Sequence, residues 1–529
     1  MKKNFLLLFQ LSICLLIPLL FLGSCMSDSL NIDPDKTLES ELDKDNLWGT
    51  YLTTMQRNVV PEDVNDFQRS EDLFGNMYAG YFAGAQSWEG GSNGTTYVFP
   101  DDWINRPFRV AYVNFLSSWN ILRQKVDSAS VLFAVGEIVK VTAMHKTTDI
   151  YGPIPYKKFG LTNPVPYDSQ KDVYESFFKE LDHAVKILTA FDRANPKSKT
   201  LEQFDLIFAS NIPKWIRFAN SLKLRLAMRI RYAYPEVRKI AEEAIANEYG
   251  VIDSNEDNPT MKSNAALSFT YYNPEYNIYS EGGYNEDCMS ASMESYLLGY
   301  EDPRCSIYFK PGADGKFHGL RNGHKNGASF FGNKNLSKPN IDQDAPYLWM
   351  NAAEVYFLRA EGSLLKWEMK GTAKDLYKQG IRTSFEQHKL EKSAEEYINS
   401  EKKPARYNGF RAGWTAVSPP IDALSEITVA WNESASFEES LERIITQKWL
   451  AMYPLGQEAW SEFRRTGYPK IFPVVDNLSN GLVSTEVQVR RSPFPESEYS
   501  GNRTEVEKGV ELLGGLDNGG TRLWWDQKK

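Results

Sequence analysis

Apolar residues recur three and four positions apart in separate blocks of this chain, and this pattern constrains its fold more than any other feature. Such spacing places apolar side chains on one face of an α-helix. At the third block, Asn211 and Pro213 are typical of a helix N-terminus. The sequence therefore predicts a mostly α-helical protein. The expected helical blocks are residues 108–148, 172–191, 213–232, 346–388 and 437–465.

These blocks form pairs of helices joined by short connections, in regions of about 108–250, 346–390 and 437–466. Paired helices with small contact residues are similar to tetratricopeptide-type hairpins, although no strict 34-residue period is present. Long segments rich in Gly, Asn, Tyr and Pro separate the pairs. We therefore expect a scaffold of helical hairpins that carries a large, irregular, loop-rich lobe, and we expect function to reside in that lobe. The irregular segments are residues 53–107, 250–345, 400–435 and 466–529.

The first residues of the chain have the pattern of an export signal. Lys2 and Lys3 precede an almost wholly apolar run, residues 5–22, and small residues follow it. This order predicts a signal peptide over residues 1–24. A transmembrane helix is the alternative because the run approaches spanning length, but Gln10 and Pro18 interrupt it.

Residues 22–25, Leu-Gly-Ser-Cys, resemble the lipobox of bacterial lipoproteins. The resemblance implies that Cys25 is acylated and becomes the new N-terminus. Residues 25–45 are polar and acidic, which predicts a flexible tether after the lipidated cysteine. We expect residues 46–529 to form a single domain.

Composition narrows the class of protein further. A hydrophobic content of 42% is typical of a globular protein, and a net charge of −9 argues against a nucleic-acid partner. Aromatic residues make up 13% of the 529 residues, which indicates that some rings face solvent and contact ligands. Cys288 and Cys305 either pair in an oxidising compartment or remain as buried thiols.

Six sets of residues, taken in order, form a recognisable pattern: 149–156 (DIYGPIPY), 215–229, 351–361, 447–453 with 458–467, 491–495 with Glu498 and Asn502, and 524–526. Together these segments resemble the SusD/RagB family of outer-membrane nutrient-binding lipoproteins of Bacteroidetes-type bacteria. The resemblance implies a SusD-like fold and a protein without enzymatic activity or cofactor. It also implies an outer-membrane lid that captures an oligosaccharide for a SusC-like TonB-dependent transporter.

Charged residues within these segments have a structural interpretation. Guanidinium and carboxylate groups on neighbouring helices form charge-assisted pairs. We expect such pairs to join one hairpin to the next rather than to contact ligand. The residues concerned are Arg225, Arg229, Arg359, Arg464 and Arg465, with Glu354, Glu361, Glu458 and Glu462.

Two aromatic segments of the irregular lobe are the candidate ligand sites. Sugar-binding proteins need aromatic faces for the pyranose ring and polar groups for its hydroxyls. The alternative is that these rings are core or cover an edge of the helical lobe. The predicted ligand-binding residues are Trp88, Asn93, Tyr97, Tyr271, Tyr272 and Tyr276, with Tyr284 nearby and with Phe330, Phe331, Trp414 and Trp431 as weaker candidates.

Catalytic and metal motifs are weak. The chain has no His-Glu-x-x-His and no phosphate-binding Gly-rich loop with Lys. Asp253, Asn255 and Asp257 have the spacing of a calcium loop, but Asn258 and Asn264 replace its Gly and Glu, so no metal site is expected.

Three alternatives to glycan capture remain. The protein could bind peptide or another nutrient, act as an exported glycoside hydrolase, or serve as a helical scaffold that binds only protein.

Overall fold

A computed structural model describes residues 44–414 and 416–528. Residues Gly49–Lys529 form one compact unit, which contains the ion pairs and the candidate sites described below. The predicted signal peptide, the lipidated Cys25 and nearly all of the tether lie outside the described residues. Within the described part, no helix combines the length and hydropathy that crossing a bilayer requires.

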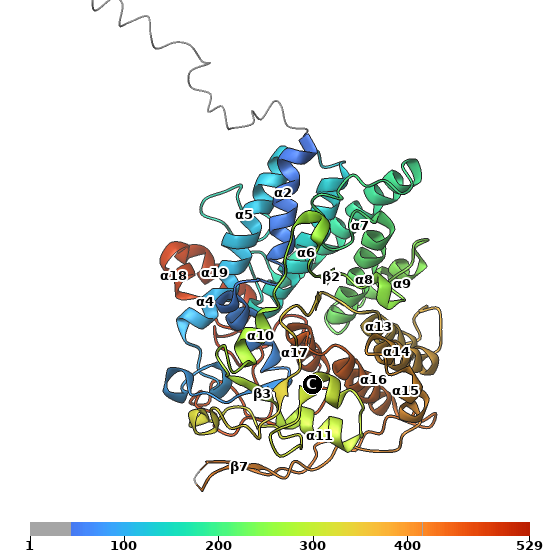
Figure 1. Ribbon diagram of the computed structural model, residues 1–529. Helices are drawn as coiled ribbons and strands as arrows, with labels where there is room; N and C mark the ends of the chain where they lie inside the picture. Colours follow the sequence, from blue (N-terminus) through green and yellow to red (C-terminus); the bar gives the residue numbers. More distant parts are fainter. Residues whose placement is uncertain (1–43, 415, 529) are drawn as a thin grey trace, which may run out of the picture. The chain divides into compact units, whose positions relative to one another are not determined.

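The structure is mostly α-helical, as the periodicity predicts (Figure 1). Asn211 accepts a hydrogen bond from the backbone N–H of Lys214, which confirms the expected N-cap. The longer helices are α2 (Lys44–Arg57), α4 (Asp101–Arg109), α5 (Leu116–Lys125), α6 (Val131–Tyr151), α7 (Gln170–Ala194), α8 (Ile212–Ile230), α9 (Val237–Ala246), α13 (Ala352–Leu364), α14 (Ala373–Gln387), α15 (Glu391–Ile398), α16 (Phe437–Ala451), α17 (Gly456–Thr466) and α19 (Arg503–Leu513).

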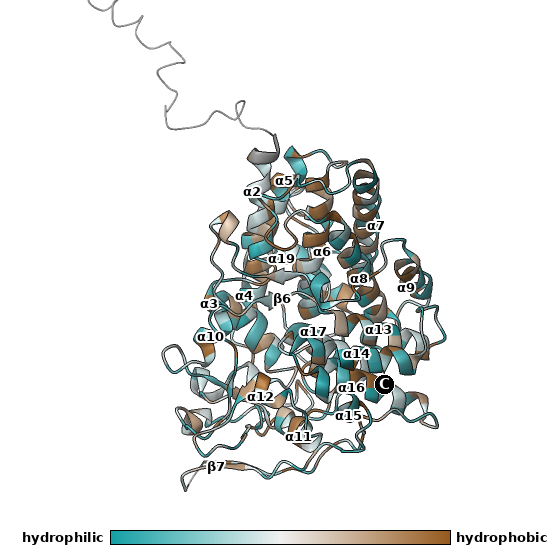
Figure 2. Ribbon diagram, turned by 45° about the vertical axis from the view of Figure 1, so that its right-hand side comes forward, coloured by the Kyte–Doolittle hydropathy of each residue, from teal (hydrophilic) through white to brown (hydrophobic). Residues whose placement is uncertain are grey.

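These helices pack in the predicted hairpins. Helix α6 packs on α7, α7 on α8 and α8 on α9, while α13 packs on both α14 and α16. Figure 2 shows that α7 and α8 each carry apolar and polar residues, as expected for helices with one buried face. Gly380 of α14 lets Phe357 of α13 approach its backbone, so a small residue sets the spacing of this pair.

Short elements fill the irregular segments. Residues 466–529 are predicted to be irregular, but α18 and α19 form there. α18 buries no residue and α19 buries only Glu505, Val506 and Gly509, so neither has a long apolar face to mark it in the sequence. The remaining helical elements are α3 (Val64–Phe67), the π-helices η2 (Gln68–Asn76) and η5 (Val110–Phe115), the 3-10 turns η3 (Trp88–Gly91), η4 (Gly94–Thr96), η6 (Asn255–Asp257), η7 (Ala265–Leu267) and η8 (Gly327–Phe330), and α10 (Pro274–Tyr279), α11 (Ala291–Gly299), α12 (Cys305–Tyr308) and α18 (Glu496–Gly501).

The strands of the described residues form four separate two-stranded antiparallel ribbons. In the ribbon β1–β3, Phe82 pairs with Met289, Ala83 with Cys288 and Gly84 with Asp287. Cys288 and Cys305 are buried free thiols, so they do not pair. The strands are β1 (Phe82–Gly84), β2 (Thr260–Met261), β3 (Asp287–Met289), β4 (Phe309–Lys310), β5 (Lys338–Pro339), β6 (Tyr347–Leu348), β7 (Phe410–Ala412) and β8 (Ala416–Ser418).

Buried ion pairs join the helical hairpins, as predicted. Arg225 of α8 donates to both carboxylate oxygens of Glu354 at the start of α13, at 2.7 and 2.6 Å. Arg465 of α17 donates to both oxygens of Glu361 of α13, at 2.6 and 2.7 Å. These bidentate pairs connect segments more than one hundred residues apart and fix the positions of the hairpins.

Arg229 pairs with Asp149 and Glu458, and so completes the network. The prediction is wrong for Arg359 and Arg464, which donate to backbone carbonyls instead. Arg359 binds the carbonyls of Met369 and Lys370 after α13, and Arg464 binds those of Asp149 and Arg490. These guanidiniums hold turns, and neither forms an ion pair with a carboxylate of the described residues.

Candidate functional site

The β1–β3 ribbon brings the two aromatic segments together. Because its strands are antiparallel and Gly84 pairs with Asp287, the chain after β1 and the chain before β3 leave the ribbon at the same end. The backbone N–H of Ala85 donates to the carbonyl of Glu286 at 2.8 Å and extends the pairing. Trp88 and Glu286 are therefore neighbours in the fold although they lie almost 200 residues apart in sequence.

The Trp88 ring is half-buried and is held from several sides. Its edge meets Trp103, with ring centroids 5.9 Å apart and planes at 75°. One face covers Gly84, where a Cβ atom would lie 2.5 Å from the Trp88 Cη2 atom. The Glu286 carboxylate lies near the same side chain. A ring fixed in this way keeps its remaining surface available for stacking at little cost in conformational entropy.

The polar group next to this ring is the Glu286 carboxylate, which accepts a hydrogen bond from Gln68 Nε2 at 2.5 Å. Burial raises the pKa of Glu286, although the Trp88 and Gln68 side chains partly oppose the rise. The Tyr284 side chain is 37% exposed, and its hydroxyl donates to Asn65 Oδ1 at 3.2 Å. We call Trp88, Tyr284, Glu286, Gln68 and Asn65 the Trp88 site.

Asn93 holds the loop that carries Trp88. Its Oδ1 accepts from the Thr95 N–H at 3.0 Å, and its Nδ2 donates to the Trp88 carbonyl at 2.8 Å. Thr96 Oγ1 accepts from the Asn93 N–H and completes a capping box. Asn93 is only 1% exposed, so its role in the structure is to position Trp88.

Asn93→Ala is therefore expected to weaken ligand binding at the Trp88 site about threefold, because the loop loses its internal hydrogen bonds and Trp88 becomes mobile. Asn93→Asp keeps the Oδ1 acceptor but loses the Nδ2 donor to the Trp88 carbonyl, so it should also weaken binding. Isothermal titration with a bound glycan checks both values. Equal affinity of Asn93→Ala and wild type would contradict this role.

The other predicted residues divide into buried and exposed side chains. Tyr97 and Tyr271 are each 2% exposed and, like Asn93, offer no surface to a ligand. Tyr272 is 57% exposed. Tyr276 packs edge-on against Tyr279 and lines a depression of about 290 Å³ together with Lys310 and Lys338. The two segments predicted to expose these side chains thus bury several of them.

The weaker candidates also differ in exposure. Phe330 is buried in a core cluster, and Trp431 packs against Tyr377 with ring centroids 5.4 Å apart. Phe331 is 46% exposed. Trp414, in the turn between β7 and β8, is 98% exposed, so it is a second solvent-facing indole outside the Trp88 site.

Sequence reasoning missed a depression of about 570 Å³ beside the Tyr308–Tyr453 stack. Its polar lining includes Asn258, Asn273 and Asn340. Amides of this kind bind hydroxyl groups. No sequence signal marks it, because its lining comes from residues 255 to 455 in many short pieces.

Catalytic and metal motifs of the sequence do not form sites here. Residues 90–94 spell Gly-x-Ser-x-Gly, but Ser92 lies between two 3-10 turns rather than between a strand and a helix, and it bonds no histidine of the described residues. In the segment with calcium-loop spacing, Asp257 pairs with Arg217 at 2.7 Å and Asn255 donates to the Thr383 carbonyl. That segment is a turn tied to helices α8 and α14.

Comparison with known families agrees with this architecture. The family model described as SusD-like, SusD and RagB outer membrane lipoprotein, matches residues 29–526. The chain belongs to the SusD-like family. The resemblance seen in the sequence, the helical-hairpin fold and the outer-membrane lipoprotein class are thereby confirmed. No curated protein matches the sequence.

Solved structures of SusD homologues share the fold over nearly the whole chain. A chitin-binding SusD homologue from Flavobacterium johnsoniae is 38% identical, with a TM-score of 0.86, and the match covers 92% of this chain and 99% of that one. A SusD homologue from Bacteroides uniformis is also 38% identical, with a TM-score of 0.81 and coverage of 91% and 99%. One from Bacteroides vulgatus is 33% identical, with a TM-score of 0.85 and coverage of 92% and 99%.

Proposed function

We propose that this SusD-like protein binds a glycan at the Trp88 site and delivers it to a SusC-like TonB-dependent transporter. The observation that carries the proposal is the half-buried Trp88 ring, which is held between Gly84 and Trp103 next to the Glu286 carboxylate. The partly exposed Tyr284 lies two residues before Glu286 in the same segment. Rings held in place suit the apolar face of a pyranose. The Glu286 carboxylate and the Asn65 amide are the groups that receive its hydroxyls.

The similarity to a chitin-binding homologue supports this class of ligand and suggests which glycan to test first. Chitin oligosaccharides present apolar sugar faces for stacking, together with amide and hydroxyl groups for hydrogen bonding. We therefore place N-acetylglucosamine oligomers at the head of a panel that also includes other glycans and peptides.

In this proposal the N-terminal segment anchors the protein and the helical hairpins face the transporter. Acyl chains on Cys25 anchor the protein at the outer face of the outer membrane, and residues 25–45 form a tether that lets it open and close over the transporter. The helical hairpins, rigidified by the Arg225 and Arg465 pairs, provide the surface that faces the transporter.

Trp88→Ala is expected to lower glycan affinity about tenfold, because stacking on one well-held ring contributes on the order of 1.4 kcal/mol. Affinity electrophoresis of the mature protein against the panel, followed by titration with the retained glycan, measures the change. Release of shorter products is not expected. Its appearance would favour the glycoside hydrolase alternative.

Trp414→Ala is the matched control, since it removes an indole that is 98% exposed and outside the site. This variant should bind as the wild type does. Loss of binding in Trp414→Ala with retention in Trp88→Ala would move the site to the β7–β8 turn. Retention in both would favour the amide-lined depression beside Tyr308, and retention of peptide alone would favour the other nutrient class.

A further inference from the structure

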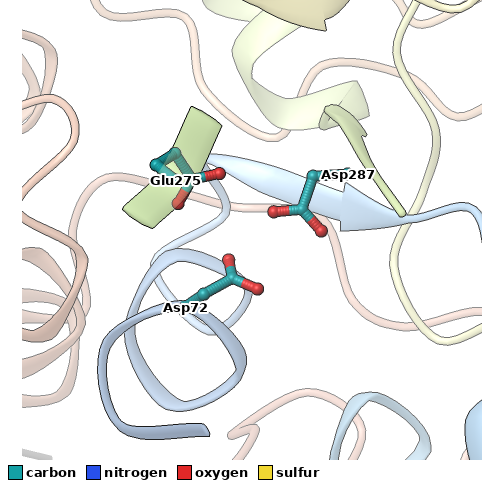
Figure 3. Close-up of side chains that lie close together, drawn as sticks. All are labelled: Asp72, Glu275 and Asp287. Carbon is teal, nitrogen blue, oxygen red and sulfur yellow. The ribbon is translucent and has the colours of Figure 1, made fainter. Parts of the chain in front are cut away.

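Three carboxylates from distant parts of the sequence meet in the interior. Asp72 lies on the π-helix η2, Glu275 on α10 and Asp287 on β3, and Figure 3 shows their side chains pointing toward one another. Asp72 and Asp287 are 0% exposed and Glu275 is 1% exposed. Burial of three acidic groups at one point is unfavourable unless something neutralises them.

No basic side chain of the described residues forms an ion pair with this cluster. Both oxygens of Asp72, both of Asp287 and Oε1 of Glu275 are buried without a hydrogen-bond partner. The nearby ammonium of Lys338 instead donates to the carbonyls of Asn285 and Asp287, at 3.3 and 2.8 Å. The buried Glu354 and Glu361, by contrast, each accept two bonds from a guanidinium. The cluster is therefore arranged unlike the carboxylates that hold the scaffold.

A further buried side chain is directed at the cluster. Asn76 is 1% exposed and its amide reaches Glu275, with Nδ2 and Oε2 3.4 Å apart, while its own Oδ1 has no partner. Because the two ends of an amide differ only in hydrogen bonding, rotation of this group would present the unpartnered oxygen to the carboxylates. The site thus contains four side chains that can supply oxygen ligands.

The separation of the oxygens allows one ion to contact all three carboxylates, because one oxygen from each lies within 4.8 Å of the others. Ca²⁺ accepts a cage of protein oxygens in flexible geometry, whereas Mg²⁺ gives up its waters reluctantly and is seldom enclosed by protein ligands alone. Ligands that are all oxygen favour a hard cation over Zn²⁺ or Cu²⁺. We propose that Asp72, Glu275 and Asp287 form a structural Ca²⁺ site.

The proposed ion would connect the π-helix η2 to the segment that contains α10 and β3. Asp72 belongs to the π-helix that also carries Gln68, and Asp287 directly follows Glu286 of the Trp88 site. Bound Ca²⁺ would hold η2, α10 and β3 together and fix the segment that bears Tyr284.

The test uses the mature protein after EDTA treatment and transfer to a buffer free of divalent ions. At pH 7.5, Ca²⁺ is expected to raise the melting temperature by about 3 °C or more and to saturate with one ion per chain, and Mg²⁺ to have a smaller effect. Tb³⁺ supplies a second readout. The Tyr453 ring lies near Glu275, whose negative charge adds to burial in raising the pKa of Tyr453. A ring in this position can sensitise the emission of a bound lanthanide. Ca²⁺ should displace this Tb³⁺ signal.

Asp287→Asn and Glu281→Gln provide the matched variants. Asp287→Asn removes one ligand charge without changing shape, so it should weaken Ca²⁺ binding at least about tenfold. Glu281, an exposed carboxylate between α10 and β3, lies outside the cluster, and its variant should respond to Ca²⁺ as the wild type does. If Asp287→Asn fails to fold, Asp72→Asn is used as the ligand variant instead. The Tb³⁺ titration of the wild type still shows whether an ion binds.

Two results would overturn the proposal. Absence of a Ca²⁺-dependent rise in melting temperature together with absence of Ca²⁺-displaceable Tb³⁺ emission would mean that protons alone neutralise the cluster. An equal response of wild type and Asp287→Asn would mean that the ion binds elsewhere. Neither result depends on glycan binding, so failure of this proposal is distinguishable from failure of the proposed function.

Discussion

Glu361→Gln is expected to lower the free energy of unfolding by about 3–5 kcal/mol, because it leaves buried guanidiniums without their carboxylate. Glu361 is 0% exposed and accepts two hydrogen bonds from Arg465 and one from Arg231, at 2.6, 2.7 and 2.7 Å. The Arg465 side chain is likewise fully buried, and its other carboxylate, Glu462, is shared with Lys448. The variant amide would turn one N–H donor toward these cations.

Glu395→Gln is the matched control. Glu395 pairs with Arg382 at 2.6 Å, the same distance as the Arg465 pair, but its side chain is 64% exposed. A solvent-exposed pair contributes about 1 kcal/mol or less, so this variant should unfold almost as the wild type does. Urea unfolding followed by circular dichroism compares the two substitutions. Similar losses of unfolding free energy in the two variants would show that burial of the ion pairs does not determine how much they contribute to stability.

The helical scaffold could be predicted because its signals are local. Each long helix buries one stripe, so its apolar residues show the helical period, and caps such as Asn211 mark the ends. The paired charges of Arg225 and Glu354 fall on helices of successive hairpins, which the sequence predicts such pairs to join. Arg359 and Arg464 look the same in sequence, yet they bind backbone carbonyls. Whether a guanidinium meets a carboxylate or a turn depends on positions that periodicity does not specify.

The candidate site could be predicted only in part, for a physical reason. A loop rich in Gly and polar residues predicts exposure, but it does not say which side chains turn inward to hold the loop. Asn93 and Tyr97 do so, and Trp88 remains at the surface. The carboxylate cluster had no sequence signal at all. Asp72 and Asp287 are more than 200 residues apart, and only the packing of η2 against the segment around β3 brings them together.

Gly84→Ala is expected to reduce glycan affinity at least about tenfold while leaving Trp88 in the chain. The added Cβ would overlap the indole ring, lying 2.5 Å from Cη2, so the ring must leave its place against Trp103. The stacking surface would then be displaced from Glu286 and Tyr284. Titration with the bound glycan gives the affinity, and the change in tryptophan fluorescence reports the movement of the ring.

Gly282→Ala and a double variant make this prediction specific. Gly282 lies in the same lobe with no atom within 4 Å of an added Cβ, so its variant should bind as the wild type does. In Gly84→Ala/Trp88→Ala the overlap disappears, because no ring remains to be displaced. The double variant should therefore bind no more weakly than Trp88→Ala alone, and the two effects should be strongly non-additive. Additive losses would show that Gly84 affects binding by a route that does not involve Trp88. That result would contradict the claim that the Trp88 ring, held against Gly84, is the central contact of the glycan site.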